Sequence, residues 1–169
     1  MIIRVKSLED LELYKDQLVD LYIKCFAEAP WHETHKPKET WEWFCKMISS
    51  ERNVAFVYLD ESQSAIAAMF CFPAKDFAII GNHTPSEIDK DGVLYFSEVF
   101  VRKECRKVGI ALKLHEETVF IAKESGFSHI IVTTRYDSSM FPILEKLGYS
   151  FITEIDVADT KRPVLIKQI

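Results

Sequence analysis

The hydrophobic residues of the N-terminal third recur at helical spacing. Ser7 and Asp10 have the spacing of a helix cap, with an acidic residue in the place usually taken by Glu or Gln. The apolar positions behind this cap are Leu8, Leu11, Tyr14, Leu18, Leu21, Tyr22 and Phe26. Their spacing predicts a helix that ends at residues 29–30. A second helix is predicted from about Pro37, a favourable first-turn residue, to Ile48.

The middle of the chain is typical of β-structure. Residues 53–60 and 64–72 are apolar runs separated by a turn-like segment, 61–63, which predicts an antiparallel hairpin. Residues 73–92 follow as a connection of mixed character, and connections of that length often bind ligands or carry a short helix. Residues 93–101 form a further predicted strand.

A strand–helix–strand unit and a closing hairpin complete the pattern. Together with the preceding elements they predict a mixed α/β (α+β) fold in a single domain spanning residues 1–169. The remaining predicted elements are a helix over 109–123 capped by Gly126, a strand over 129–134, a helix from Ser138 or Ser139 to Gly148, and strands over 149–157 and 163–167.

Composition and charge narrow the function. The formal net charge of -5 disfavours a general nucleic-acid binder and agrees with a cationic acceptor such as an amine. The start of the chain lacks a signal-peptide pattern, and no stretch approaches the roughly 18 apolar residues of a membrane helix. The four scattered cysteines form no CxxC pair, which favours a reduced, cytoplasmic protein. His32 and His35 have an i, i+3 spacing but no accompanying ligand triad, so no metal site is predicted.

Residues 94–112 carry the most informative pattern. A predicted strand ends at Val101, a charged turn follows, and Arg106-x-x-Gly109-x-Ala111 opens a helix. A helix N-terminus presents free N–H groups and the positive end of the helix dipole, so it can hold phosphate oxygens. Gly109 lets backbone approach a ligand closely, and the neighbouring arginines and lysines add positive charge. The pattern therefore indicates a phosphate-binding turn.

In these residues the sequence resembles the GCN5-related N-acetyltransferase (GNAT) superfamily. That family carries Arg or Gln, two residues, Gly, one residue, then Gly or Ala directly after its fourth strand, as at Arg106, Gly109 and Ala111. The later segment ILEKLGYSFI resembles the family's helix-then-strand ending. The resemblance implies a central, mostly antiparallel twisted sheet with a parallel strand pair around the cofactor-binding helix. It also implies acetyl-CoA as the co-substrate.

The resemblance further implies where acetyl-CoA binds. The pantetheine arm is expected on the main chain of Val99 and Val101, in a gap beside strand 129–134. A backbone N–H near Val99 or Phe100 is expected to polarise the acyl carbonyl. Asp137 occupies the place of a cofactor-contacting Asn. The pyrophosphate is expected on the backbone of Arg106, Lys107, Val108, Gly109, Ile110 and Ala111.

The proton-transfer groups are less well defined. Leu144 replaces the tyrosine with which family members protonate the departing thiolate, which leaves Tyr136 or solvent for that role. Glu98, inside an apolar strand, is the candidate base that takes a proton from the amine. Two alternatives stay open: Glu98 faces outward on an alternating strand, or Ser97 occupies the acidic position of the family.

Two functions are consistent with these residues. The first is an N-acetyltransferase that moves the acetyl group directly to an amine of a small molecule, peptide or protein. The second is a non-catalytic acyl-CoA-binding module, which Leu144 favours. The acceptor pocket is expected from residues 27–40, residues 73–92 and the end of the chain, with Trp31 as one wall. A homodimer is a further expectation, because dimers are common in such families.

Overall fold

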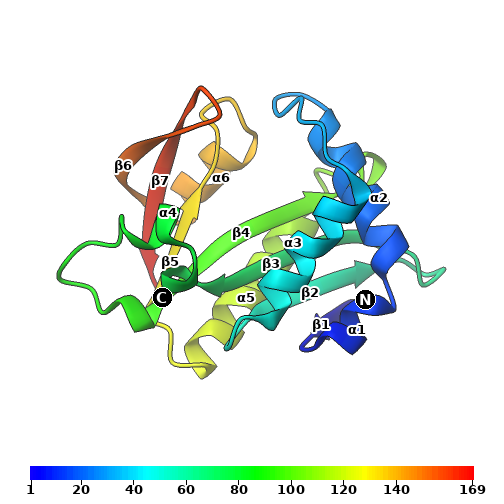
Figure 1. The fold of residues 1–169 in the computed structure, drawn as a ribbon, viewed down its shortest axis with the longest axis horizontal. Coiled ribbons are helices and arrows are strands. Elements are labelled where there is room, and N and C mark those ends of the chain that lie inside the picture. The colour runs from blue at the N-terminus through cyan, green and yellow to red at the C-terminus, as the bar shows by residue number, and fades with distance from the viewer.

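The computed structural model describes residues 1–169, and its centre is one seven-stranded sheet (Figure 1). The strands lie in the order β1-β2-β3-β4-β5-β7-β6, and every neighbouring pair is antiparallel except β4 and β5, which are parallel. The predicted mixed fold is therefore confirmed. The strands are β1 (Ile2–Val5), β2 (Val54–Leu59), β3 (Ala65–Pro73), β4 (Val93–Val101), β5 (His129–Thr133), β6 (Ser150–Val157) and β7 (Thr160–Gln168). The helices are α1 (Leu8–Glu12), α2 (Lys15–Ala27), α3 (Pro37–Ser49), α4 (Ala78–Gly81), α5 (Ile110–Glu124) and α6 (Met140–Lys146).

Helices cover both faces of the sheet. Helices α1, α2 and α3 pack on one face, and α5 and α6 pack on the other (Figure 1). On the first face, the ring of Phe44 from α3 stacks on Phe70 and Phe100, with centroid distances of 4.8 and 5.9 Å. On the second face, Leu114 of α5 is fully buried. Because both faces are covered, β3 is an uninterrupted apolar run that is buried at every residue.

The N-terminal region differs from the prediction in two ways. Residues 2–5 form an edge strand that pairs antiparallel with β2, although so short an apolar run does not stand out in the sequence. The predicted first helix is two helices, because the chain turns at Leu13 and Tyr14. The predicted cap is confirmed: Ser7 Oγ accepts from the Asp10 N–H, and the Asp10 carboxylate accepts from the Ser7 N–H.

The connection after β3 and the end of the chain also differ. Residues 73–92 carry α4 between two short 3-10 turns, and Ile80 of α4 is buried. β7 begins at Thr160 rather than at residue 163, because it pairs with β6 directly after the turn at Ala158 and Asp159. None of the helices combines the length and the hydropathy that a membrane-spanning segment needs.

The parallel pair is short, and this opens the sheet. β4 pairs with β5 only from Val93 to Phe96, opposite His129 to Val132. Beyond Phe96, β4 continues to Val101 along β3 alone, while β5 stays paired with β7. One edge of β4 is consequently left without a strand partner.

We expect Phe44→Ala to lower the free energy of unfolding by about 3–5 kcal/mol, because it leaves a cavity between two stacked rings. Denaturant unfolding followed by circular dichroism measures this change. Phe120→Ala is the matched control, since Phe120 lies on α5 and is 58% exposed, and it should change the free energy by less than about 0.5 kcal/mol. Equal losses in the two variants would contradict the packing.

Candidate functional site

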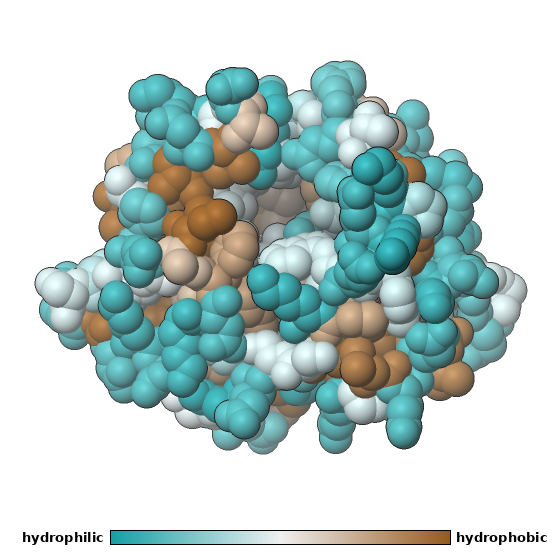
Figure 2. Space-filling model, in the orientation of Figure 1, coloured by the Kyte–Doolittle hydropathy of each residue, from teal (hydrophilic) through white to brown (hydrophobic).

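A cleft of about 470 Å³ opens where β4 and β5 separate. Its walls come from α2 and the loop after it, the second half of β4, the start of α5, the end of β5, α6 and one residue of β7. In the space-filling view the surface is hollowed near the centre, with hydrophobic residues on part of the rim (Figure 2). Segments far apart in the sequence therefore meet around the unpaired edge of β4.

The start of α5 forms one end of the cleft. The main-chain N–H groups of residues 107–112 donate to no main-chain carbonyl. The first hydrogen bond of the helix runs from the Lys113 N–H to the Gly109 carbonyl, at 3.0 Å. Gly109 has φ +85°, a conformation that only glycine adopts easily, and open space lies where a side chain would stand. A row of free donors thus coincides with the positive end of the helix dipole, an arrangement suited to an anion.

Much of the positive charge in the turn is already paired within the protein. Arg106 donates from Nε to the Val101 carbonyl at 2.8 Å and from Nη1 to Glu28 at 2.7 Å. The Arg106 guanidinium therefore joins the end of β4 to the end of α2. Lys103 also pairs with Glu28, at 3.7 Å. Lys107 is exposed, lines the cleft and has no ion pair, so its charge is available to an anion.

A β-bulge in β4 decides which side chains face α2 and α3. The register with β3 shifts so that Ser97 has no partner between Phe96 and Glu98. Tyr95 and Phe100 pack on the same face of the sheet, although simple alternation would place residues five apart on opposite faces. The extra residue thus turns Glu98 towards the helices that cover this face. Ser97 also lines the cleft.

The carboxyl group of Glu98 is partly buried at the wall of the cleft. Trp43 Nε1 donates to Glu98 Oε1 at 3.0 Å, and the hydroxyl of Tyr22 lies beside it. Burial raises the pKa of Glu98 to about 7; the hydrogen bond from Trp43 opposes this shift, and the charge of Glu33 adds to it. Arg162 and Tyr22 also oppose it. A carboxyl group with a pKa near neutrality is suited to accept a proton in catalysis.

The main chain after the bulge directs polar groups into the cleft. The Arg102 N–H donates to a β3 carbonyl at 2.7 Å, whereas the Val101 carbonyl points the other way and accepts from Arg106 Nε. Main-chain groups alternate in direction along a strand, so the N–H and carbonyl of Val99 also face the cleft. The N–H of Phe100 faces β3 instead. Of the two expected positions for a polarising N–H, Val99 is the one on the cleft side.

Residues 136 and 137 do not reach the cleft. The hydroxyl of Tyr136 donates to Glu154 Oε2 at 2.9 Å, and Asp137 accepts two hydrogen bonds from Arg135, at 2.9 and 3.0 Å. Neither Tyr136 nor Asp137 is among the lining residues, because these bonds hold them outside. Leu144 does line the cleft and is buried, so the structure places no proton donor there.

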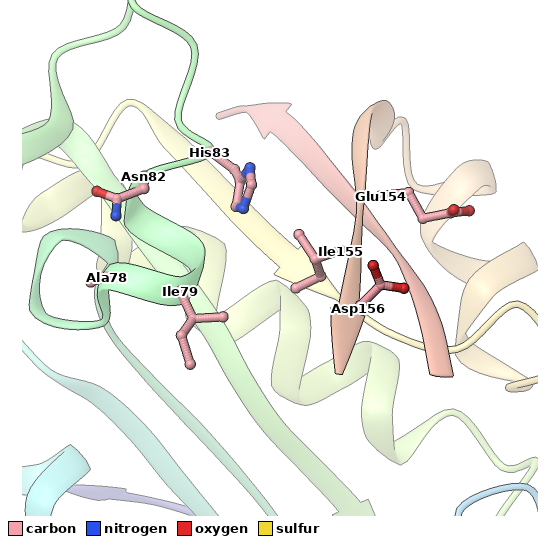
Figure 3. Close-up of a pocket in the computed structure, with 7 residues that line it drawn as sticks. All are labelled: Ala78, Ile79, Asn82, His83, Glu154, Ile155 and Asp156. Carbon is pink, nitrogen blue, oxygen red and sulfur yellow. The ribbon is translucent and has the colours of Figure 1, made fainter. Parts of the chain in front are cut away.

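Two of the three segments expected around an acceptor reach the cleft. Trp31 and Glu33 come from the connection after α2, and Arg162 comes from β7. Helix α4, in the third segment, instead faces β6 across a separate open hollow, where Ile155 points towards α4 and Glu154 points away (Figure 3). Arg162 has no marker in the sequence, since an arginine at the start of a C-terminal strand is common.

His35, in the segment after α2, contacts other protein side chains. His35 Nε2 lies 2.9 Å from Glu33 Oε2. No group of three His, Cys, Asp or Glu side chains is arranged to hold a metal ion.

The sequence was compared with protein families and with known proteins. The family model described as acetyltransferase (GNAT) family matches residues 15–149. No curated protein sequence matches the chain.

Solved structures with the same fold cover nearly all of it. A GNAT superfamily phosphinothricin acetyltransferase from Sinorhizobium meliloti, in complex with acetyl-CoA, is 13% identical with a TM-score of 0.76, over 100% of this chain and 88% of that chain. A ribosomal-protein-alanine N-acetyltransferase from Brucella melitensis is 14% identical with a TM-score of 0.74, over 100% and 99%. An aminoglycoside 6'-acetyltransferase type Ii is 17% identical with a TM-score of 0.71, over 99% and 96%. At these identities the likeness establishes the fold.

We expect Glu98→Gln to stabilise the protein more at pH 8 than at pH 5. The folded-state pKa of Glu98, about 7, lies above its unfolded value, so the stability that the protonated group contributes is present at low pH and is lost as pH rises through 7. Glutamine does not titrate and can still accept from Trp43. The stability difference between variant and wild type should therefore increase by roughly 2–3 kcal/mol between pH 5 and pH 8.

Denaturant unfolding at the two pH values measures this difference. Glu116→Gln, at an exposed position of α5, is the matched control and should show no such change. A pH-independent difference for Glu98→Gln would show that the carboxyl group titrates normally.

Proposed function

The chain belongs to the acetyltransferase (GNAT) family, and we propose that the cleft along β4 is where it moves an acetyl group from acetyl-CoA to an amine. One observation carries the proposal. A free helix N-terminus, an unpaired strand edge and a partly buried carboxyl group with a pKa near 7 lie in one cleft. These are the parts needed to hold the donor, to orient its acyl arm and to deprotonate an amine.

The donor is proposed to lie along the open edge of β4. Its pyrophosphate would accept from the N–H groups at the start of α5, with the charge of Lys107 beside them. Its pantetheine amides would pair with the main-chain groups of Val99. The Val101 carbonyl is occupied by Arg106, so only the N–H of Val101 is offered to the arm.

The proposed transfer uses one protein base. Glu98, ionised, takes a proton from the acceptor ammonium, and the neutral amine forms the new C–N bond at the acetyl carbonyl. The N–H of Val99 stabilises the charge that develops on the carbonyl oxygen. The C–S bond then breaks, and the second proton that the nitrogen loses passes through water to the thiolate, because Leu144 offers none.

The structure supports transfer over binding alone. A non-catalytic acyl-CoA-binding protein would need the start of α5 but not a partly buried carboxyl group beside the proposed place of the acetyl group. Burying Glu98 is costly for the folded protein, because the charged form is disfavoured there. A chemical role accounts for that cost.

We also propose a cytoplasmic location for the protein. All four cysteines are free in the structure, which supports a reducing, cytoplasmic setting. A homodimer stays a prediction.

We expect Ala111→Trp to weaken acetyl-CoA binding by at least about tenfold, since an indole at the second position of α5 would cover the free N–H groups. Position 111 is a better test than Gly109, where the positive φ would strain any replacement. Isothermal titration calorimetry measures the affinity. Lys113→Trp is the matched control, because Lys113 is exposed on the same helix and does not line the cleft. Unchanged affinity in Ala111→Trp would refute the donor site.

We expect wild-type kcat/KM to rise with pH up to about 7 and then level off, because only ionised Glu98 accepts a proton. Glu98→Gln should remove this rise and lower kcat/KM by roughly 10²–10⁴-fold. Release of free thiol from acetyl-CoA with a panel of amines measures the rate. Tight acetyl-CoA binding without turnover on any amine would instead identify a binding module.

A further inference from the structure

Arg162 reaches into the same cleft as Glu98, from the strand on its opposite side. Its side chain is only 16% exposed, and Nη2 donates to Glu33 Oε1 at 3.1 Å. The guanidinium lies over the indole of Trp31, 5.3 Å from the ring centroid. Arg162 pairs with Ile155 of β6, and β7 pairs with β5 from Val164 onward, so the backbone that carries Arg162 is fixed. The guanidinium is therefore held in place at the cleft wall.

Most of the hydrogen-bonding capacity of Arg162 is unused. A guanidinium has five N–H donors, and the structure gives one hydrogen bond, to Glu33. The Nε atom is buried and has no acceptor. A buried donor without an acceptor destabilises the folded protein, and guanidinium donors fit the two oxygens of a carboxylate. The unused donors on the two terminal nitrogens thus favour an anionic group in the cleft.

Glu33 does not offer its charge to a ligand in the same way. One oxygen accepts from Arg162 and the other lies 2.9 Å from His35 Nε2. Its negative charge is matched by the arginine next to it. A second ammonium group on the acceptor would consequently find no unpaired carboxylate at this wall besides Glu98.

The wall between these charges is aromatic. The rings of Tyr22 and Phe26 lie 4.4 Å apart, and Phe26 and Trp31 lie 5.4 Å apart. All three line the cleft. A cleft of about 470 Å³ must also admit the acetyl end of the donor, which leaves room for a small acceptor with an apolar side chain.

We propose that the acceptor is a free amino acid with an apolar or aromatic side chain, whose carboxylate binds Arg162 while its amine meets Glu98. This inference rests on the transfer proposed above. Glu98 accepts a proton from an amine, the unused donors of Arg162 bind an anion, and the aromatic wall packs against an apolar side chain. A free amino acid carries all three within a few bonds.

The experiment compares L-phenylalanine with L-phenylalaninamide, which differs only in lacking the carboxylate charge. Arg162→Gln should lower kcat/KM for the acid by roughly 10–100-fold, the range for a lost charge-assisted hydrogen bond, and change the amide by less than about threefold. The fold-change caused by Arg162→Gln is measured separately for each substrate. Comparing the two fold-changes removes the effect of the different basicity of the two amines. Lys161→Gln is the matched control, since Lys161 is an exposed neighbour on β7 that pairs with Glu154, and it should leave both rates unchanged.

A second readout does not depend on transfer. Binding of L-phenylalanine to the enzyme–CoA complex, followed by saturation-transfer NMR, should weaken at least about tenfold in Arg162→Gln. Equal losses for acid and amide would assign Arg162 a structural role, and faster turnover of diamines than of L-phenylalanine or L-leucine would favour a cationic acceptor; either result overturns the inference. Binding that depends on Arg162 without acetyl transfer would refute the proposed function but keep the carboxylate site.

Discussion

The separation of β4 from β5 after Phe96 is the constraint on which the site depends. Each strand keeps its other partner, β3 for β4 and β7 for β5, so the sheet stays intact while one edge opens inside the molecule. Main-chain polar groups that lack partners are costly when buried. The open edge must therefore face water or a ligand, and α5 begins at its end with a further set of unpaired N–H groups. One gap in the strand pairing thus creates both the space and the hydrogen-bonding groups for an extended ligand.

The bulge at Ser97 gives this gap its chemistry. It places Glu98 on the side of the sheet covered by α2 and α3, where Trp43 donates to the carboxylate and the side chain is partly buried. The same burial that brings the pKa near 7 makes the ionised group unfavourable for the folded state. Stability and function therefore oppose each other at this residue, as is common where a site needs a perturbed group.

Two ion pairs fix the segment that follows α2. Arg106 binds Glu28 at the end of α2, and Arg162 binds Glu33 five residues later. The first pair anchors the segment to the turn before α5, and the second anchors it to β7. Trp31 lies between these two anchors. The basic residue that marks the turn in the sequence thus serves mainly to connect the two halves of the cleft, while the backbone N–H groups remain available to an anion.

By itself the sequence determined the features that depend on neighbouring residues. Periodicity placed most helices and strands, and the pattern ending at Ala111 located the helix start, because caps, glycine turns and apolar spacing act over a few residues. Only the tertiary structure decided which way Glu98 points, since a single bulge reverses the faces of the strand residues that follow it. It alone excluded Tyr136 from the cleft and brought Arg162 to Glu33, 129 positions away. Such contacts depend on strand register and packing, which no local pattern encodes.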